Sequence, residues 1–498
     1  MAGLQVASRI DPARFEVHLH HEDWHGPFDT SRPVEADLVF LTGLQSDFDR
    51  MRQLAWFFRR GGATVVAGGS ICSNFPEFAA QFFDAVCVGS VESTGRVVAD
   101  FLAGTLRPIY RAAPLSIDRH PLDYGLLTRA GIRTQSHLIE ASRGCSFKCS
   151  FCTMPGEFGG HAGYDLAALR QAIGSAIETS PRFSLRRIFP TIFFLDNNFS
   201  DDRDHMLAVC DLLRADRRIR AWGALVTQNI LQDHALVRHL AAAKCRTLFV
   251  GLESLDAATL RRFNKKQNLG RSGNLLDDIA HAERHGILIT YGYLLDIQNQ
   301  TVAEMAAQLR AIGEAADLPM PTYLSLIAPL AGTRFFWSAL RDGHLAPRLR
   351  LRDLDGESLC YSEIADAPGK VAAFADQVFR RPWEVIPLHH ALRKAWRRLG
   401  RLGLAHPLLW FMTLSATFHS FLWAGAYPSR RVTYRAGEDV LDPQYGAHPP
   451  DLSEEDRARY FEPIALTDAA GAPAAWLLPY LGGALPGAER HEPATLEA

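Results

Sequence analysis

The sequence predicts an α/β protein with two successive sheet domains followed by a mainly helical region. The chain has 498 residues, which is too long for one ordinary hydrophobic core. Short apolar runs alternate with amphipathic segments over residues 1–110 and again over residues 130–340, a pattern typical of parallel sheets with covering helices. Residues 111–129 are expected to link the two domains, and residues 345–498 to form helices with an irregular tail.

Composition excludes several classes of protein. Apolar residues make up 47% and charged residues 22% of the chain, as in a globular protein, and the net charge of −2 gives no strong field to attract nucleic acid. Eight cysteines in so long a chain do not form a disulfide scaffold. The first ten residues lack the basic and apolar regions of a signal peptide, so we expect a cytoplasmic protein.

The first domain is expected to open with a short helix and then to alternate strands with helices. The expected strands cover residues 15–20, 36–42, 64–67 and 85–89, and the expected helices cover residues 48–60 and 76–83. This order predicts a parallel, doubly wound sheet of the Rossmann or flavodoxin-like kind, in which ligands bind beyond the carboxyl ends of the strands.

The second domain is expected to contain six strand–helix units. The expected strands cover residues 137–141, 187–195, 220–228, 247–254, 287–295 and 322–328, and clear helices cover residues 165–179, 203–215 and 275–285. The run at 187–195 is apolar throughout, which indicates a strand buried on both faces.

Three cysteines lie close together after the first of these strands. Cys145, Cys149 and Cys152 are spaced by three residues and then by two, after a glycine-marked turn at Ser142–Gly144. A loop can wrap three thiolates around one inorganic cluster, and iron–sulfur clusters are usually held by four thiolates. A cluster with three protein ligands keeps one iron open for another molecule. The alternative is a zinc site, but His161 is a poor fourth ligand because it follows a glycine-rich run.

This spacing, with the aromatic Phe151 before the last cysteine, resembles the signature of the radical S-adenosylmethionine (SAM) enzymes. The resemblance implies a [4Fe-4S] cluster on Cys145, Cys149 and Cys152 whose open iron chelates SAM. In that family an electron from the cluster cleaves SAM to methionine and a 5′-deoxyadenosyl radical, which abstracts hydrogen from a substrate. An electron donor such as flavodoxin or ferredoxin is then expected as a partner.

The rest of the second domain is similar to the same family and implies a partial (β/α)6 TIM barrel with its active site at the carboxyl ends of the strands. Matching stretches are Phe194–Phe199, Val250–Ser254, Asn264–Asn268 and Ala328–Thr333. The resemblance implies SAM contacts by Phe151, Asp196, Gln228, Glu253 and Ser254. Glu253 could instead form a salt bridge with Arg246 or Arg261, and Asp196 or Gln228 could cap the next helix. The family's second glycine near Leu295 is missing from Tyr291–Asp296, which puts the SAM contact of the fifth strand in doubt.

The first domain is similar to the cobalamin-binding domain that precedes many radical SAM barrels. The matching stretches are Asp37–Val39, Gly61–Ser70 and Gly89–Glu92, the last followed by Asp100. Two features depart from that pattern. The chain begins at a helix where the family has a central strand, so either the start is placed too late or this strand is lost, and no Asp-x-His-x-x-Gly motif is present. Cobalamin binding is left open.

The other five cysteines are interpreted as small buried hydrophobic residues. They are Cys72, Cys87, Cys210, Cys245 and Cys360, and Cys72 stands apart because it follows a glycine-rich loop on the expected ligand side.

The C-terminal region suggests contact with a membrane surface. Leu392 and Trp396 recur at helical spacing among basic residues, and an apolar stretch from Leu408 to Ala424 follows. Polar residues interrupt that stretch, so a helix packed on the barrel is favoured over a span of about 20 residues. Residues 390–427 could also form a peripheral contact with an anionic membrane.

The function that this resemblance implies is radical SAM chemistry. The main hypothesis is cobalamin-dependent C-methylation of a lipid or secondary metabolite. Terpenoids and tetrapyrroles are further substrate classes that the resemblance implies. Rearrangement, cyclisation or oxidation without cobalamin is the main alternative. A tRNA methylthiotransferase would need three more cluster cysteines in the first domain, which holds only Cys72 and Cys87. A non-catalytic cluster-bearing sensor is the alternative outside the enzymes.

Overall fold

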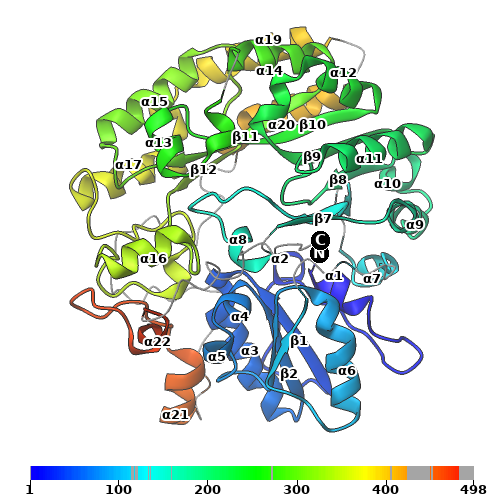
Figure 1. Ribbon diagram of the computed structural model, residues 1–498, viewed down its shortest axis with the longest axis vertical. Coiled ribbons are helices and arrows are strands. Elements are labelled where there is room, and N and C mark those ends of the chain that lie inside the picture. Colours follow the sequence, from blue (N-terminus) through cyan, green and yellow to red (C-terminus); the bar gives the residue numbers. More distant parts are fainter. Residues whose placement is uncertain are drawn as a thin grey trace, which may run out of the picture.

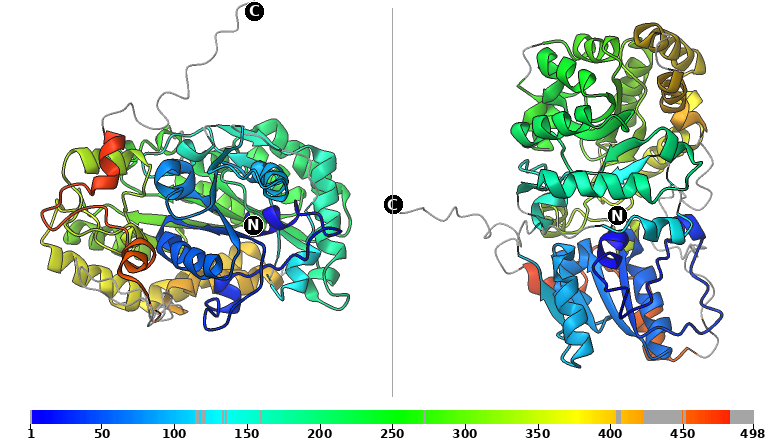
Figure 2. Two further views of the ribbon diagram at one scale, coloured as in Figure 1. Left: turned by 90° about the horizontal axis from the view of Figure 1, so that it is seen from below. Right: turned by 90° about the vertical axis from the view of Figure 1, so that its right-hand side faces the viewer.

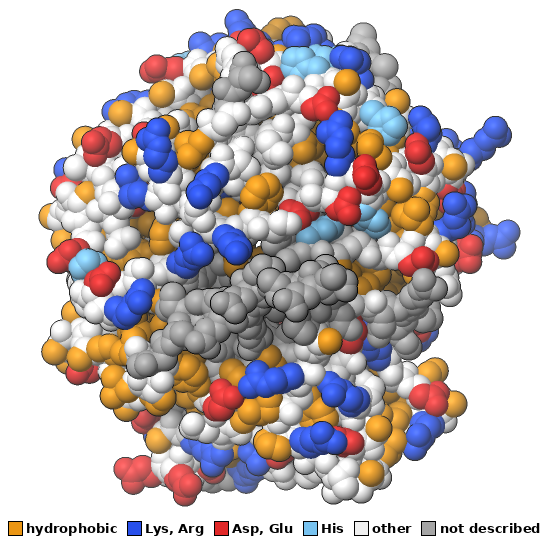
Figure 3. Space-filling view, viewed as in Figure 1, with side chains coloured by type: hydrophobic (Ala, Val, Ile, Leu, Met, Phe, Trp, Pro, Cys, Tyr) orange, Lys and Arg blue, Asp and Glu red, His pale blue; other side chains and the backbone are white. Residues whose placement is uncertain are grey.

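The computed structural model describes residues 2–113, 117, 122–132, 134, 136–158, 160–270, 273–403, 407–422, 449 and 452–481. They form two sheet domains stacked one above the other, with helices of the C-terminal region on the outer side of the larger domain (Figure 1). Acidic and basic side chains are interspersed over the face in Figure 3, as expected from a net charge of −2. Much of the expected linker, residues 114–116 and 118–121, lies outside the described residues.

The first domain contains a four-stranded parallel sheet in the order β1-β2-β3-β4. The strands are β1 (Leu38–Gly43), β2 (Thr64–Gly69), β3 (Ala85–Val88) and β4 (Ile109–Arg111). The helices are α1 (Ala2–Ala7), α2 (Glu22–His25), α3 (Phe48–Arg60), α4 (Ser70–Asn74), α5 (Pro76–Ala79) and α6 (Thr94–Leu102). Val65 packs with Phe48 of α3 and its neighbours, whereas Val66 packs with Val97 of α6, so helices cover both faces of the sheet.

Two expectations for the first domain were wrong. Residues 15–20 belong to no strand. The alternation of Phe15, Val17 and Leu19 reflects partial burial of these side chains against the domain, and the segment pairs with no described strand. The helix expected over residues 76–83 ends at Ala79.

In the first domain β1 pairs directly with β2, and no described strand takes the place of the central strand that cobalamin-binding domains of the similar family have. Leu38 of β1 lies opposite Thr64 of β2, and the register continues to Gly43 opposite Gly69. No gap is left between β1 and β2, and the order of the described strands contains no reversal.

The second domain is a partial barrel of six parallel strands in the order β12-β11-β10-β9-β8-β5, with β5 and β12 as free edges. The strands are β5 (His137–Ile139), β8 (Thr191–Phe194), β9 (Ala221–Thr227), β10 (Cys245–Glu253), β11 (Leu288–Leu295) and β12 (Tyr323–Leu326). The main covering helices are α9 (Leu166–Glu178), α11 (Arg203–Ala215), α12 (His234–Ala242), α14 (Leu275–Arg284), α15 (Val302–Glu314) and α16 (Arg334–Arg341). The predicted α/β fold class is confirmed.

The strand expected over residues 187–195 is shorter than predicted. Its first part belongs to α10 (Leu185–Ile188), and Phe189 is 56% exposed at the edge of the barrel. Within β8 only Ile192 and Phe194 are buried, so one face of this strand is covered fully and the other in part.

The C-terminal region divides between the two domains (Figure 2). The helices α17 (Pro368–Arg380), α18 (Pro382–Val385), α19 (Leu388–Leu402) and α20 (Pro407–Leu422) follow the barrel, and α19 contacts α14, α15 and α20. Residues 452–481 return to the first domain, where Trp476 stacks on Phe78 at 4.0 Å between ring centroids and Tyr460 accepts a hydrogen bond from Arg59. This returning segment contains α21 (Glu454–Asp456) and α22 (Leu478–Leu481).

The basic helix α19 turns part of its charge toward the barrel. Arg398 is 2% exposed and lies 2.5 Å from Glu283, while the fully buried ammonium of Lys394 donates to the carbonyl oxygen of Leu318 at 2.6 Å. Leu392 and Trp396 instead face outward, with exposed fractions of 55% and 80%. None of the described helices is long and apolar enough to cross a membrane. Residues 423–427 of the expected membrane contact lie outside the described residues.

Candidate active site

The three clustered cysteines lie on a loop that a small hairpin holds at both ends. Strand β6 (Ser142–Gly144) leads into the loop, and β7 (His161–Gly163) leaves it in antiparallel register, with Gly144 opposite His161. The loop starts just beyond the carboxyl end of β5. Cys145, Cys149 and Cys152 lie outside every described helix and strand, on a loop as predicted.

The thiols are close enough to affect one another. Burial raises the pKa of Cys152 to about 12, and repulsion from the other two thiols adds to this shift. Burial likewise raises the pKa of Cys145 to about 11, with a smaller contribution from Asp201. Such thiols need cationic partners to ionise, and bound iron supplies positive charge.

The ligation of a cluster by the three cysteines stays a prediction. Among the described residues no group of three His, Cys, Asp or Glu side chains is placed to hold one ion. A cubane cluster distributes its thiolates over separate irons, so it does not need them to meet at one point. His161, the fourth ligand considered for zinc, lies 3.9 Å from Asp201.

Polar contacts fix the backbone of the loop from the barrel side. The amide of Gly144 donates to Asn197 at 2.9 Å, and the amide of Ser146 donates to Asp201 at 3.1 Å. On the other side, the side chain of Gln267 donates to the sulfur of Cys149 at 3.6 Å. Hydrogen bonds to cluster sulfurs are one means by which proteins set a reduction potential.

Asp196, expected at a strand end, joins two strand ends together. It is 1% exposed, and its carboxylate accepts hydrogen bonds from the amide of Ala141 at 2.8 Å and the hydroxyl of Ser142 at 2.5 Å. Burial raises the pKa of Asp196 to about 7 against the opposing effect of these hydrogen bonds. Asp196 therefore positions the segment that delivers the cysteine loop, and its contact with SAM stays a prediction.

Glu253 lies at the carboxyl end of β10 in a strained conformation. Its φ of 62° falls in the left-handed region, which non-glycine residues adopt at a cost, often at functional sites. Its ion-pair partner is Lys265 at 2.7 Å, not the Arg246 or Arg261 considered from the sequence. Lys265 is 5% exposed, and Glu253, with smaller contributions from Cys149 and Cys152, raises its pKa against the effect of burial, so a buried cation lies beside the cysteine loop.

The other candidate SAM contacts are placed at the same edge. Gln228 is 2% exposed directly after β9, and Ser254 is 2% exposed directly after β10. Phe151 packs edge-on against Phe263, with 5.5 Å between ring centroids. Their roles toward SAM stay predictions, but all three lie where the carboxyl ends of the strands meet the cysteine loop.

Sequence reasoning did not name Lys265 or Gln267 as site residues, and it left Arg143 open between a cation that offsets cluster charge and a solvated surface residue. The first two belong to the matched stretch Asn264–Asn268, which was a signal for their position. Arg143 is 3% exposed and forms ion pairs with Glu92 at 2.9 Å and Glu140 at 2.8 Å. No local pattern predicts its partner Glu92, which lies 51 residues away in the sequence.

The carboxyl edges of the two sheets face each other across the domain interface. Gln45, just after β1, accepts a hydrogen bond from the amide of Ala331, just after β12, at 2.7 Å. Ser90, just after β3, accepts one from Arg143, two residues before the first cysteine. Ligands of α/β barrels bind at the carboxyl edge of the strands, so this edge of the barrel faces the carboxyl edge of the first sheet, whose described strands have no reversal of order.

The first domain leaves open backbone at this edge. A Cβ atom at Gly89 would meet nothing within 4 Å, and one at Gly68 would find its nearest neighbour at 4.0 Å. Gly69, the last residue of β2, is by contrast closed, because a Cβ atom there would lie 2.5 Å from the carbonyl oxygen of Gly43. Cys72 is 1% exposed and belongs to the core, as do Cys210, Cys245 and Cys360, whereas Cys87 is only half-buried.

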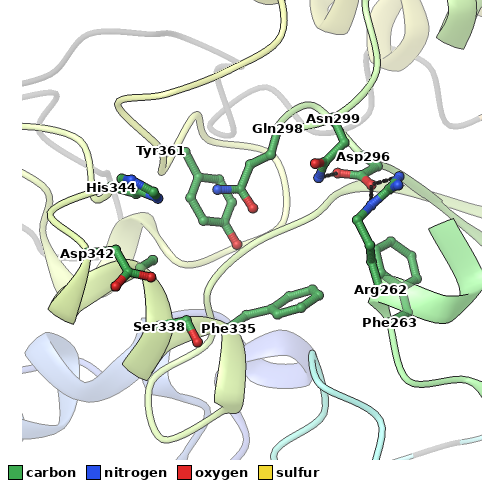
Figure 4. A pocket seen from close by; sticks show the side chains of 11 residues that line it. Arg262, Phe263, Asp296, Gln298, Asn299, Phe335, Ser338, Asp342, His344 and Tyr361 are labelled. Carbon is green, nitrogen blue, oxygen red and sulfur yellow. Dashed lines mark hydrogen bonds and ion pairs between the residues drawn. The ribbon is translucent and has the colours of Figure 1, made fainter. Parts of the chain in front are cut away.

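A cavity of about 300 Å³ opens on the outer side of the cysteine loop (Figure 4). Arg262 and Asp296 form an ion pair of 2.6 Å in its wall, and Phe263 and Phe335 lie on its floor. Phe263 separates the cavity from the cysteine loop, because it lines the cavity and also packs against Phe151 of the loop. The hydroxyl of Tyr361, whose residue is 2% exposed, has no hydrogen-bond partner among the described residues.

Curated relatives match most of the chain. No family model matches it. It is 25% identical over 344 residues to bacteriochlorophyllide d C-8(2)-methyltransferase of Chlorobaculum tepidum, which covers 67% of this chain and 74% of that protein. It is 24% identical over 319 residues to hopanoid C-2 methylase of Rhodopseudomonas palustris, which covers 62% of this chain and 58% of that protein. The chain thus spans less than two thirds of the hopanoid methylase.

Solved structures share the fold. The radical SAM methyltransferase TsrM from Kitasatospora setae, with cobalamin and a [4Fe-4S] cluster bound, gives a TM-score of 0.53 at 16% identity and covers 70% of this chain and 73% of that one. The cobalamin-dependent SAM radical enzyme OxsB gives a TM-score of 0.54 at 14% identity and covers 78% of this chain and 64% of that one.

A cobalamin-domain-like sheet, a six-stranded partial barrel and a three-cysteine loop between them define one class of protein. The resemblance inferred from the sequence is confirmed: the chain is similar in sequence to bacteriochlorophyllide and hopanoid methyltransferases, and it shares the fold of cobalamin-dependent radical SAM enzymes.

Proposed function

We propose that this enzyme cleaves SAM reductively at a [4Fe-4S] cluster and uses cobalamin to methylate an unactivated carbon of a small molecule. The observation that carries the proposal is the opposition of the two carboxyl edges. The cysteine loop begins beyond β5, Gly89 follows β3 with open space beside it, and contacts such as Gln45 with Ala331 hold these edges together. A cluster and a planar cofactor bound there would share one reaction space.

The residues of this chain have distinct roles in the proposal. Cys145, Cys149 and Cys152 hold the cluster, which when bound supplies the open iron and the electron for SAM cleavage. Glu253 and Ser254 offer acceptors for the hydroxyl and ammonium groups of SAM, and Gln228 and Phe151 line the same edge. Asp196 and Lys265 position the loop and Glu253, which keeps the site ordered before any ligand arrives.

The substrate that we propose is a polycyclic lipid or secondary metabolite. Two relatives are named for methylation of bacteriochlorophyllide d and of a hopanoid, both small molecules with extended ring systems. A tetrapyrrole or a hopanoid-like lipid is therefore the first class to test. The donor of the electron is proposed to be a flavodoxin or ferredoxin.

The test uses anaerobically purified protein with a reconstituted cluster. With SAM, dithionite and added methylcobalamin, the wild-type protein should form 5′-deoxyadenosine and retain cobalamin through gel filtration. The Cys145→Ala variant should form none, because one iron of the cluster loses its ligand. Deoxyadenosine without retained cobalamin would favour rearrangement, cyclisation or oxidation over methyl transfer. Equal yields from the wild type and Cys145→Ala would refute radical SAM chemistry.

A lipid-like substrate also favours a peripheral membrane contact through α19. Its outward stripe of Leu388, Leu392 and Trp396 is 48%, 55% and 80% exposed, and His389, Arg393 and Arg397 are exposed beside it. Apolar side chains flanked by cations are typical of helices that lie on anionic lipid surfaces. The apolar stripe, rather than the inward basic residues, would then meet the lipid.

Vesicle sedimentation tests this contact. Trp396→Glu should weaken binding to vesicles containing phosphatidylglycerol, whereas Phe183→Glu, at an 87% exposed residue before α10, should not. Equal binding of both variants and the wild type would contradict a membrane role for α19.

A further inference from the structure

Five basic side chains surround the outer side of the cysteine loop. Lys148 belongs to the loop itself, between the first two cysteines. Arg262 precedes Phe263, whose carbonyl oxygen accepts a hydrogen bond from the amide of Ser150 at 2.9 Å. Arg261 lies at the same end of α13 (Ala257–Arg262). The remaining two basic residues are each adjacent in sequence to another residue that contacts the loop.

Lys266 and Arg334 complete this group, which we call the basic rim. Lys266 precedes Gln267, whose side chain reaches the sulfur of Cys149. Arg334 begins α16 and precedes Phe335, whose amide donates to the carbonyl oxygen of Ser150 at 3.2 Å. Three separate segments therefore bring cations to one face, and Figure 3 shows Lys and Arg side chains gathered over the region between α13 and α16.

The charges of the basic rim are largely uncompensated. All five side chains are exposed. Arg262 pairs with Asp296, but Lys148, Arg261, Lys266 and Arg334 are in no ion pair with another described residue. Asp296 is 1% exposed and presents no negative charge to the solvent beside them. The whole chain carries a net charge of −2, so this local excess of positive charge stands against the average of the molecule.

The rim has no evident role in holding the loop. The hydrogen bonds that fix the loop use the backbone of residues 150, 263 and 335 and the side chains of Asn264 and Gln267, not the charged groups. Exposed cations that do not stabilise a fold are available for a partner of opposite charge.

We propose that the basic rim is the docking surface for a small acidic protein that carries one electron. This inference rests on the proposed function and adds the place where the electron enters. In the step, the carrier would lose one electron and the bound cluster would gain it. That electron would then reduce SAM, whose carbon–sulfur bond breaks to give methionine and the 5′-deoxyadenosyl radical. Docking here places the carrier against the loop that holds the cluster, outside the edge where SAM and substrate bind.

The experiment compares two reductants in one preparation. Reduced flavodoxin is the probe for docking, and dithionite, a small molecule that needs no docking surface, is the reference. The variant is the triple substitution Arg261→Glu, Lys266→Glu and Arg334→Glu. The control is Arg170→Glu with Arg238→Glu, two exposed cations on α9 and α12.

With flavodoxin, the triple variant should show a rise of about tenfold or more in the KM for the carrier, because like charges now face each other. With dithionite, it should form 5′-deoxyadenosine as fast as the wild type. The wild-type KM for flavodoxin should increase with salt, since exposed charges are screened over about 10 Å at 0.1 M. The control variant should match the wild type in each assay.

A binding measurement makes the test independent of turnover. Calorimetric titration with oxidised flavodoxin should give a dissociation constant that the triple variant weakens by about tenfold and the control leaves unchanged. Unchanged binding in the triple variant would overturn the proposal. If no protein forms deoxyadenosine with dithionite, the proposed function fails, while the titration still decides whether the rim binds the carrier.

Discussion

The barrel buries charged groups on two opposite sides, and the two sides differ in what those groups join. On the side of the cysteine loop, Arg143 is 3% exposed and connects the loop to Glu92 of the first domain. On the side of α19, Arg398 is 2% exposed and connects that helix to Glu283 of α14. The two arginines are buried to nearly the same extent, and each pairs with a buried glutamate. The desolvation free energy that each ion pair must offset is therefore similar. The difference is that only Arg143 lies beside the cysteine loop, two residues before Cys145.

The largest expected effect comes from removing each arginine in turn. Arg143→Met and Arg398→Met should each lower the free energy of unfolding by roughly 3 kcal/mol, because a buried carboxylate loses its main partner. Denaturant titration of the apo protein measures this. Only Arg143→Met should also change the iron content and the EPR spectrum of the reconstituted protein. Equal changes in the cluster of both variants would show that the effect is one of general stability.

Two buried lysines provide a second comparison between the side of the cysteine loop and the side of α19. Lys265 is 5% exposed and pairs with Glu253 beside the cysteines, whereas Lys394 is fully buried and donates to the carbonyl oxygens of Ala315 and Leu318. A cation near the cluster favours its reduced, more negative form. Lys265→Met should therefore lower the reduction potential, by an interaction on the order of 1–2 kcal/mol.

The matched variant Lys394→Met should leave that potential unchanged. An EPR-monitored redox titration of both reconstituted variants checks the direction. A potential that rises in Lys265→Met, or that shifts equally in Lys394→Met, would contradict a local electrostatic role for Lys265.

Sequence patterns predicted local structure well and long-range partners poorly. The helices at residues 48–60 and 203–215 begin and end where the periodicity of their apolar residues indicates. The cysteine loop was likewise predicted from spacing alone. These features depend on neighbours in the chain, which a sequence displays directly.

The features that the sequence did not reveal depend on residues far apart. The inward orientation of Lys394 and Arg398 is set by Glu283 and by carbonyl groups near residue 318, so the amphipathic pattern alone suggested an outward basic face. The pairing of Glu253 with Lys265, 12 residues away, depends on a bulge in β10 and on the turn after α13. Such contacts form only once the barrel is assembled.

The smallest expected effect concerns two buried tyrosines on the same two sides. The hydroxyl of Tyr291 donates to the carbonyl oxygen of Pro319 at 3.0 Å, whereas the hydroxyl of Tyr361 in the cavity has no partner among the described residues. Tyr291→Phe should cost about 1–2 kcal/mol of stability, because a buried carbonyl loses its donor. Tyr361→Phe should be neutral or stabilising by up to about 1 kcal/mol. Thermal unfolding of both variants decides the point: a loss in Tyr361→Phe as large as that in Tyr291→Phe would mean that a molecule in the cavity satisfies the hydroxyl.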